Sequence, residues 1–160
     1  MKRLILISLL LTLGYSSCFD SSSSMSNSNK LDSDDYNSKS ERVTILKNEI
    51  KSFSDFENAA FELFNVNGFS NSRTTLPGAS SWDYKFVIKI NPSDVDKWTV
   101  GMVEAISQYH EDAWMKKIIE KTELEWQTFT EPEIYSRPGD NVLMVVYRSE
   151  GIIYKRVISL

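Results

Sequence analysis

Few residue types that commonly perform catalysis are gathered in this sequence. His110 is the only histidine of the chain and stands in a polar stretch between two expected helices. A histidine can act as a general base because its ordinary pKa lies near neutrality, but no nucleophile-elbow motif accompanies this one. We therefore interpret His110 as a polar loop or helix-end residue, predict no catalytic residue, and do not expect an enzyme.

Clusters that hold metals or phosphates are also missing from the sequence. One histidine and one cysteine cannot supply the usual ligand set of a zinc or copper site. The carboxylate pairs worth naming are Glu111 with Asp112 and Glu131 with Glu133, and we interpret both as solvated surface. No Gly-rich loop precedes an expected helix, so no phosphate cradle is indicated. The sequence predicts neither a metal nor a cofactor.

Aromatic and basic residues beside polar loops are better candidates for a binding function. Trp82 follows a polar stretch over residues 69–81, and Tyr135 and Arg137 precede a Pro-Gly turn. Trp, Tyr and Arg are enriched at the energetic centres of protein interfaces. Aromatic side chains also fill the cores of small domains, which is their commoner role. With that alternative open, Trp82, Tyr135 and Arg137 form the candidate binding surface.

The first 17 residues have the layout of a secretion signal. Lys2 and Arg3 are followed by an apolar run over residues 4–13 and then by small residues. This order of charged region, short apolar region and cleavage zone is typical of signal peptides. The run is shorter than the roughly 20 apolar residues of a spanning helix. We therefore assign residues 1–17 to a signal peptide.

The single cysteine, Cys18, comes directly after this segment. Ser16, Ser17 and Cys18 resemble the lipobox of bacterial lipoproteins, and Tyr15 stands where that pattern usually has an aliphatic residue. The resemblance implies that Cys18 is lipidated, becomes the new N-terminus and anchors the protein to a membrane of the cell envelope. It leaves open whether that is the inner or the outer membrane.

Composition divides the remaining chain into a tether and one domain. Residues 18–40 are rich in Ser, Asn and Asp, and such polar sequence favours a flexible tether. Residues 41–160 have the usual size of a single globular domain. The formal net charge of −4 argues against a nucleic-acid partner, whose binding depends on basic patches. We expect the membrane lipid and a protein of the envelope as partners.

Hydrophobic spacing predicts helices over residues 43–52, 55–66, 93–106 and 111–122. The prediction for 55–66 depends on Ser54 and Glu57, which fit a capping box, and on apolar residues at helical spacing after them. Strands are expected where apolar residues alternate or run together. Their ranges are 82–90, 133–137, 142–148 and 152–159, with a further strand beginning at 126–129.

These elements predict an α+β domain: a small antiparallel sheet of three to four strands with two to three helices packed on one face. The function that we expect is non-catalytic binding by a membrane-anchored lipoprotein, one form of which is an immunity or inhibitor protein. The alternatives are a small envelope hydrolase, which would use His110 or a carboxylate pair, and a structural component of the envelope.

Overall fold

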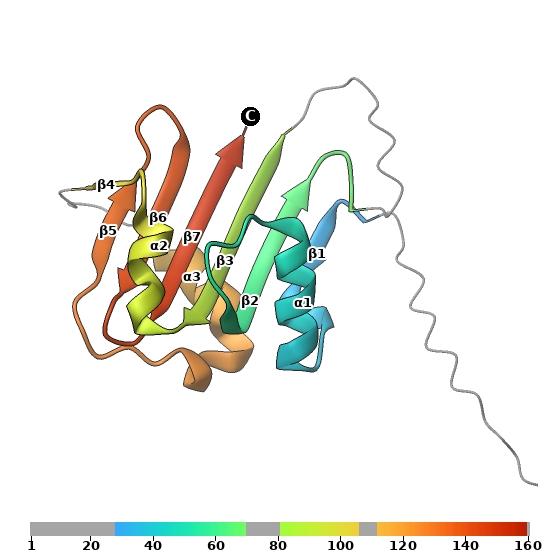
Figure 1. Cartoon of the computed structure of the whole chain (residues 1–160). Helices are drawn as coiled ribbons and strands as arrows, with labels where there is room; N and C mark the ends of the chain where they lie inside the picture. Colours follow the sequence, from blue (N-terminus) through green and yellow to red (C-terminus); the bar gives the residue numbers. More distant parts are fainter. Residues whose placement is uncertain (1–27, 70–80, 106–111, 160) are drawn as a thin grey trace, which may run out of the picture.

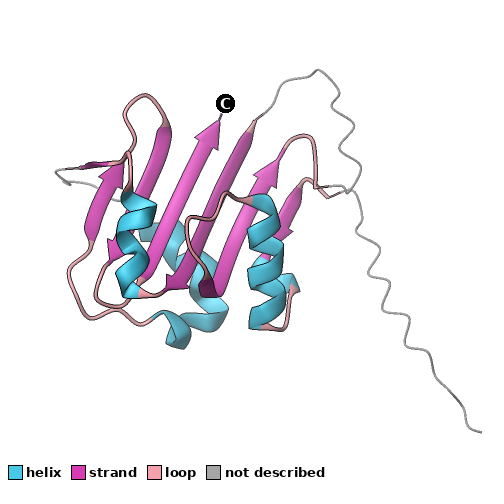
Figure 2. Cartoon of the chain, in the orientation of Figure 1, coloured by secondary structure: helices cyan, strands magenta, loops and turns pink. Residues whose placement is uncertain are grey.

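The fold is built around one antiparallel sheet (Figures 1 and 2). The computed structural model of the chain describes residues 28–69, 81–105 and 112–159. Within these residues the sheet has seven strands in the order β1-β2-β3-β7-β6-β5-β4. The strands are β1 (Lys30–Asp32), β2 (Phe56–Asn65), β3 (Trp82–Ile90), β4 (Val103–Glu104), β5 (Glu133–Ser136), β6 (Asn141–Tyr147) and β7 (Ile152–Ser159).

Helices cover both faces of this sheet. Figure 1 shows α1 and α2 in front of the strands and α3 behind them, and the two faces are called front and back accordingly. Within the described part of the chain, no helix has the length and apolar character needed to cross a membrane. The helices are α1 (Lys39–Glu49), α2 (Val95–Thr99) and α3 (Asp112–Ile119), with short 3-10 helices η1 (Ser33–Asp35), η2 (Pro92–Asp94) and η3 (Glu120–Trp126).

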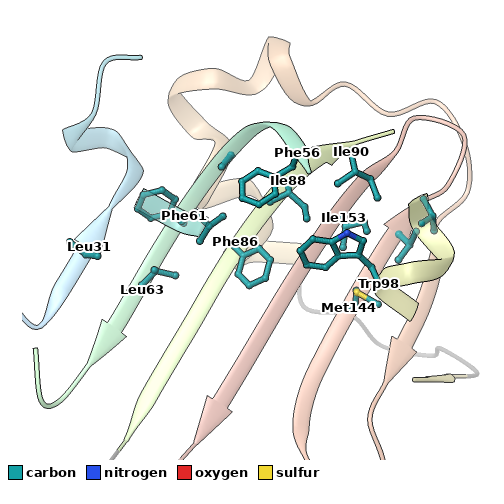
Figure 3. Close-up of a cluster of buried hydrophobic side chains, with 14 of the residues drawn as sticks. Leu31, Phe56, Phe61, Leu63, Phe86, Ile88, Ile90, Trp98, Met144 and Ile153 are labelled. Carbon is teal, nitrogen blue, oxygen red and sulfur yellow. The ribbon is translucent and has the colours of Figure 1, made fainter. Parts of the chain in front are cut away.

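Each face of the sheet carries its own hydrophobic core. In the front core, Leu46 of α1 and Trp98 of α2 pack on the sheet, and Figure 3 shows Trp98 beside Met144 and Ile153. In the back core, side chains of α3 and η3, among them Trp114, pack on the other side of the same strands. Successive residues of a strand point to opposite faces, so the central strands are apolar on both.

The α+β class predicted from the sequence agrees with this architecture, but the expected sheet of three to four strands was too small. The expectation that the helices pack on one face was also wrong, since α3 lies opposite α1 and α2. Strands buried on both faces have near-continuous apolar sequences instead of alternating ones. The alternation that we counted therefore understated the number of layers. The four main strands predicted from residues 82 onward are confirmed as β3, β5, β6 and β7.

The helix predicted for residues 55–66 is wrong, because this segment is β2. Its pairing with β3 shifts register between Phe56 and Asn58, and such a bulge adds one residue to a strand. Phe56 and Ala59 consequently both reach the front core although they are three positions apart. Ala60 faces the back core. A bulged strand with two buried faces thus imitates the spacing of an amphipathic helix.

The other predicted helices exist with different ends. The helix expected at 43–52 is α1, which begins earlier because the Ser38 side chain accepts a hydrogen bond from the Glu41 amide. The one expected at 93–106 stops at Thr99, and Gly101 follows with a left-handed φ of 74° that ends the helical path. The helix expected at 111–122 is α3 followed by η3, and the strand expected from Trp126 is absent from the described residues 112–136 up to β5.

The folded part of the chain also begins earlier than predicted. We assigned residues 18–40 to a flexible tether, but Lys30–Asp32 form β1, and Leu31 is buried in the front core. A single apolar residue in a polar stretch is too weak a signal for a strand, because pairing with β2 supplies most of its order. The domain that we placed at 41–160 therefore extends back to β1, and residues 18–27 lie outside the described part.

Candidate functional site

The front face of the sheet is covered over only part of its height. In Figure 1 the upper ends of β3, β7 and β6 extend beyond α1 and α2. Burial follows this arrangement, because Ile153 is fully buried whereas Val157, farther along β7, is half-buried. At the boundary, Lys155 pairs with Met144 on one side and Phe86 on the other. Among the residues that the structure describes, the upper front face is thus the part of the sheet that no helix covers.

Five residues of this open part form what we call the front-face surface. Trp82, Tyr84 and Phe86 are alternate residues of β3, and alternate residues of a strand point to the same face. Phe86 belongs to the front core, so the side chains of Tyr84 and Trp82 also point to the front. Tyr135 packs against the edge of the front core. The surface consists of Trp82, Tyr84, Tyr135, Arg137 and Lys155.

The three residues proposed from sequence as a binding surface are all on this face. Tyr135 and Arg137 lie at one end of the surface, on and after β5. Trp82 lies on β3, and the order β3-β7-β6-β5 separates it from β5 by three strand spacings, roughly 14 Å at about 4.8 Å each. All three side chains are half-buried. The structure therefore places them on a common face without direct contact between Trp82 and the other two.

Lys155 is the least expected member of the surface. Only 7% of its area is exposed, and its Nζ lies 5.6 Å from the ring centroid of Phe53 and 6.0 Å from that of Trp98. Burial and, to a smaller degree, the positive charge of Arg137 lower the pKa of Lys155 to about 8. No carboxylate among the described residues raises that pKa. At neutral pH this side chain is therefore a buried cation that two aromatic rings stabilise only in part.

The other buried cation of the described residues, Arg42, and the partly buried Lys85 both have carboxylate partners. Arg42, whose side chain is 8% exposed, lies 3.4 Å from a Glu125 carboxylate oxygen. Lys85 contacts Glu62 and Asp83. Burying a charge is costly unless it is paired. Lys155 departs from this rule.

The back face shows what such pairing looks like when it is complete. Arg156 donates to both carboxylate oxygens of Asp83 at 3.0 and 2.9 Å. Burial raises the pKa of Asp83, but hydrogen bonds and charges of Arg156 and Lys85 lower it more, so the net shift is downward. Glu62 likewise has its pKa raised by burial and lowered to a greater extent by Lys117, Lys85 and Lys30. Each of these carboxylates is therefore compensated by cations close to it.

Tyr135 is held in place by an ion-pair network at the edge of the surface. Its hydroxyl donates to Glu133 Oε2 at 2.7 Å, and Arg148 donates to both oxygens of Glu133 at 2.8 Å. The hydrogen bonds from Arg148 are the largest influence on Glu133 and lower its pKa. The hydrogen bond from Tyr135 also lowers this pKa, whereas burial raises it. Arg148 also donates to Asp96 of α2 at 2.7 Å. Glu133 is therefore a positioning group for Tyr135, and its interpretation as solvated surface was wrong, since it is half-buried and paired with Arg148. Glu131, two residues earlier, is exposed as expected.

Several residues singled out from the sequence cannot be placed. Cys18, His110 and Glu111 lie outside the described residues, and Asp112 is described only as the first residue of α3. Across residues 28–69, 81–105 and 112–159, no group of three or more His, Cys, Asp or Glu side chains is arranged to hold a metal ion.

Sequence reasoning missed Lys155 and Tyr84. The sequence did indicate that Lys155 is unusual, because Ile153, Lys155 and Val157 are alternate residues of β7 and therefore point to the same face. A lysine at a position that should face the core is informative, since lysine is almost never fully buried without a partner. Tyr84 gave no such signal, because a tyrosine in a strand is ordinary core material.

The chemistry available at the front-face surface is recognition of a ligand. Aromatic rings offer apolar and stacking contacts, and Lys155 with Arg137 offers positive charge. The residues described around Lys155 include no acid–base partner or nucleophile within hydrogen-bonding distance of it, which a catalytic constellation would need. In comparisons with known proteins, no family model matched the chain, and neither the curated proteins nor the solved structures contained a significant match.

Proposed function

We propose that this chain is a lipid-anchored binding protein of the cell envelope that holds a partner protein on its front-face surface without catalysis. The observation that carries the proposal is the upper part of the front face, where half-buried aromatic side chains share a face with Lys155. This cation contacts two aromatic rings but has no carboxylate partner among the described residues. An exposed surface that combines Tyr, Trp and Arg with a buried centre is typical of interface hot spots.

Charge complementarity indicates which kind of partner this surface fits. Arg137 and Lys155 make it locally positive, although the chain has a formal net charge of −4. A partner segment with an acidic residue between apolar ones would pair with the cations and cover the rings. The immunity or inhibitor role expected from overall acidity would instead bring a cationic partner, so we propose a partner that is acidic where it touches this face.

Site-specific photo-crosslinking in cells tests the binding surface. With a photoreactive amino acid at Tyr135 of the full chain, we expect one discrete adduct, because Tyr135 borders the surface. The same probe at Lys116, an exposed residue of α3 on the back of the sheet, serves as the matched control and should not give that adduct. Adduct yields on blots of membrane fractions, normalised to protein level, provide the measurement.

A charge reversal makes this test specific. Arg137→Glu should reduce the Tyr135 adduct at least about tenfold, since it repels an acidic partner and places a competing carboxylate near Lys155. Lys116→Glu, the matched reversal on the back, should leave the yield unchanged. Equal adducts from both probe positions, or an adduct insensitive to Arg137→Glu, would contradict the proposed surface.

Lipid anchoring is tested by the intact mass of the protein purified from membranes. We expect a chain that begins at Cys18 and carries a diacylglyceryl or triacyl group, because Cys18 follows the lipobox-like residues. Cys18→Ala should lack this mass and lose membrane association, since the lipid supplies the anchor. An unlipidated wild-type chain, cut elsewhere or uncut, would contradict this part of the proposal and show that Tyr15 prevents processing.

A further inference from the structure

We infer that Lys155 is the receiving group of an anion site, and that the ligand bound on the front-face surface presents a carboxylate on an apolar or aromatic group to it. The inference rests on the proposed binding function and specifies the chemistry of the group that the surface recognises.

The first step is the missing counter-charge. Lys155 is more than nine-tenths buried and makes contacts to two aromatic rings, but it forms no ion pair with a described residue. Every side-chain nitrogen of the described residues that is sealed from solvent has a hydrogen-bond partner. No hydrogen bond of the Lys155 ammonium to a described residue is present, so this ammonium retains some access to solvent. An anion bound at this ammonium would remove a cost that the folded protein otherwise carries.

The second step is the clustering of positive charge around this position. Arg137 is close enough to Lys155 to lower its pKa, and its own partner Asp140 is a distant one, at 3.7 Å in an exposed turn. The positive charge of Arg137 therefore disfavours the charged form of Lys155. A bound carboxylate would neutralise this repulsion.

The third step concerns the shape of the ligand. Phe53 and Trp98 flank the ammonium, and the Trp98 indole N–H donates to Ser54 at 2.9 Å, which fixes the ring. Tyr84 and Trp82 continue the face along β3. Trp98 is buried, but Phe53, Tyr84 and Trp82 are only half-buried. A small hydrated anion would leave these three rings in contact with water, whereas a carboxylate on an aromatic or aliphatic group would cover them. Benzoate is the simplest probe with both features.

The test is a titration of the full chain in detergent with benzoate, followed by NMR of lysines labelled at Cε. We expect the Lys155 signal, identified by its absence in Lys155→Met, to shift saturably, and the pKa of this lysine to rise towards its ordinary value. Benzamide has the same shape without the charge and should cause neither change. Arg137→Gln should weaken benzoate binding about tenfold, the loss of one charge-assisted contact.

The outcomes separate this inference from the proposed function. A Lys155 signal that does not respond to benzoate, or that responds equally to benzamide, overturns the anion site, while the Tyr135 adduct still reports on the binding surface by itself. Benzoate that shifts Lys155 and also competes with formation of the adduct supports the inference and assigns the carboxylate to the partner. Benzoate that shifts Lys155 but leaves the adduct intact overturns this assignment to the partner.

Discussion

Replacement of Lys155 by Met is expected to make the protein more stable at pH 7, although it removes a side chain from the centre of the front-face surface. Burial and Arg137 lower the pKa of Lys155 from 10.5 to about 8. While the lysine is charged, this difference corresponds to about 3 kcal/mol of lost stability. The two cation–π contacts that Met would forfeit offset part of this, at about 0.5–1 kcal/mol each. We expect a net gain of about 1–2 kcal/mol.

The pH dependence of this gain has a definite sign. At pH 7 the lysine is protonated in both the folded and the unfolded chain, so the folded protein bears the full cost of the buried charge. Between pH 8 and 10.5 the folded chain releases its proton first, and the unfolded chain binds more protons. Stability contributed by Lys155 therefore rises with pH in this window. The advantage of Lys155→Met should shrink accordingly as the pH rises from 7 to 9.5.

Urea unfolding of both proteins at pH 7.0 and 9.5 measures this effect. Comparison of the two chains at each pH removes contributions that they share, such as that of Tyr154, whose pKa is raised by burial. Lys116→Met on the exposed face of α3 is the control and should show a difference close to zero at both pH values. A wild type more stable than Lys155→Met at pH 7, or a difference that does not change with pH, would contradict the buried, uncompensated charge.

This expected gain is itself an argument about function. A residue that destabilises the fold at a central strand position breaks the agreement between local sequence and structure that folding favours. Natural proteins tolerate such departures mainly at functional sites. Met144, the neighbour of Lys155 on β6, shows that an uncharged side chain of similar length packs at this depth. The lysine is therefore better explained by what it binds than by what it stabilises.

Strands could be predicted from sequence where local signals, such as alternating apolar residues or a turn sequence, mark them. Trp82 to Ile90 alternates strongly, and Pro138-Gly139 marks the turn into β6, so β3 and the C-terminal hairpins were recognisable from local signals. Segment 55–66 failed for a physical reason. A local pattern records spacing, and the bulge after Phe56 together with the second core on the back face altered that spacing. Neither feature is local.

The residues of the candidate site could likewise be predicted only in part, because some of their properties are local and others depend on the fold. Trp82, Tyr135 and Arg137 were identified because their residue types are common in interfaces and adjoin loops. Their common face depends on the strand order, in which β7 lies between β3 and β6, and no local pattern contains that order. Lys155 could have been noticed from its alternation with Ile153, but its lack of an acidic partner is a property of the folded neighbourhood.

Loss of the Arg42 side chain is expected to destabilise the protein by about 3 kcal/mol, because this buried cation joins three elements. Its Nε donates to the Ala59 carbonyl at 2.8 Å and its Nη2 donates to Asn58 Oδ1 at 3.1 Å. The same Nη2 lies 3.4 Å from Glu125 of η3. Because β1 pairs with β2 only from Glu62 onward, Arg42 satisfies a carbonyl on the part of β2 that β1 does not reach.

Arg42→Ala would leave the Ala59 carbonyl without this donor and remove the cation from Glu125, although Asn58 Oδ1 and Glu125 Oε2 keep hydrogen bonds from the Ala59 amide and Asn58 Nδ2. Removal of one member of a buried charged network typically costs about 3–5 kcal/mol. We place the loss at about 3 kcal/mol, the lower end, because Glu125 is about one-third exposed and water can replace part of its contact. Arg42→Lys should be intermediate, since an ammonium cannot reproduce the forked geometry of the guanidinium. Urea unfolding at neutral pH measures all three proteins.

Lys39→Ala provides the matched control for this network. Lys39 also pairs with Glu125, at 3.4 Å, but its side chain is 56% exposed, and exposed pairs contribute about 0–1 kcal/mol. A loss below about 1 kcal/mol in Arg42→Ala, or an equal loss in Lys39→Ala, would mean that the network does not hold α1, β2 and η3 together. The expected contrast instead ties stability to Arg42, whose partners come from β2 and η3. Lys155, which has no carboxylate partner among the described residues, should oppose stability at neutral pH.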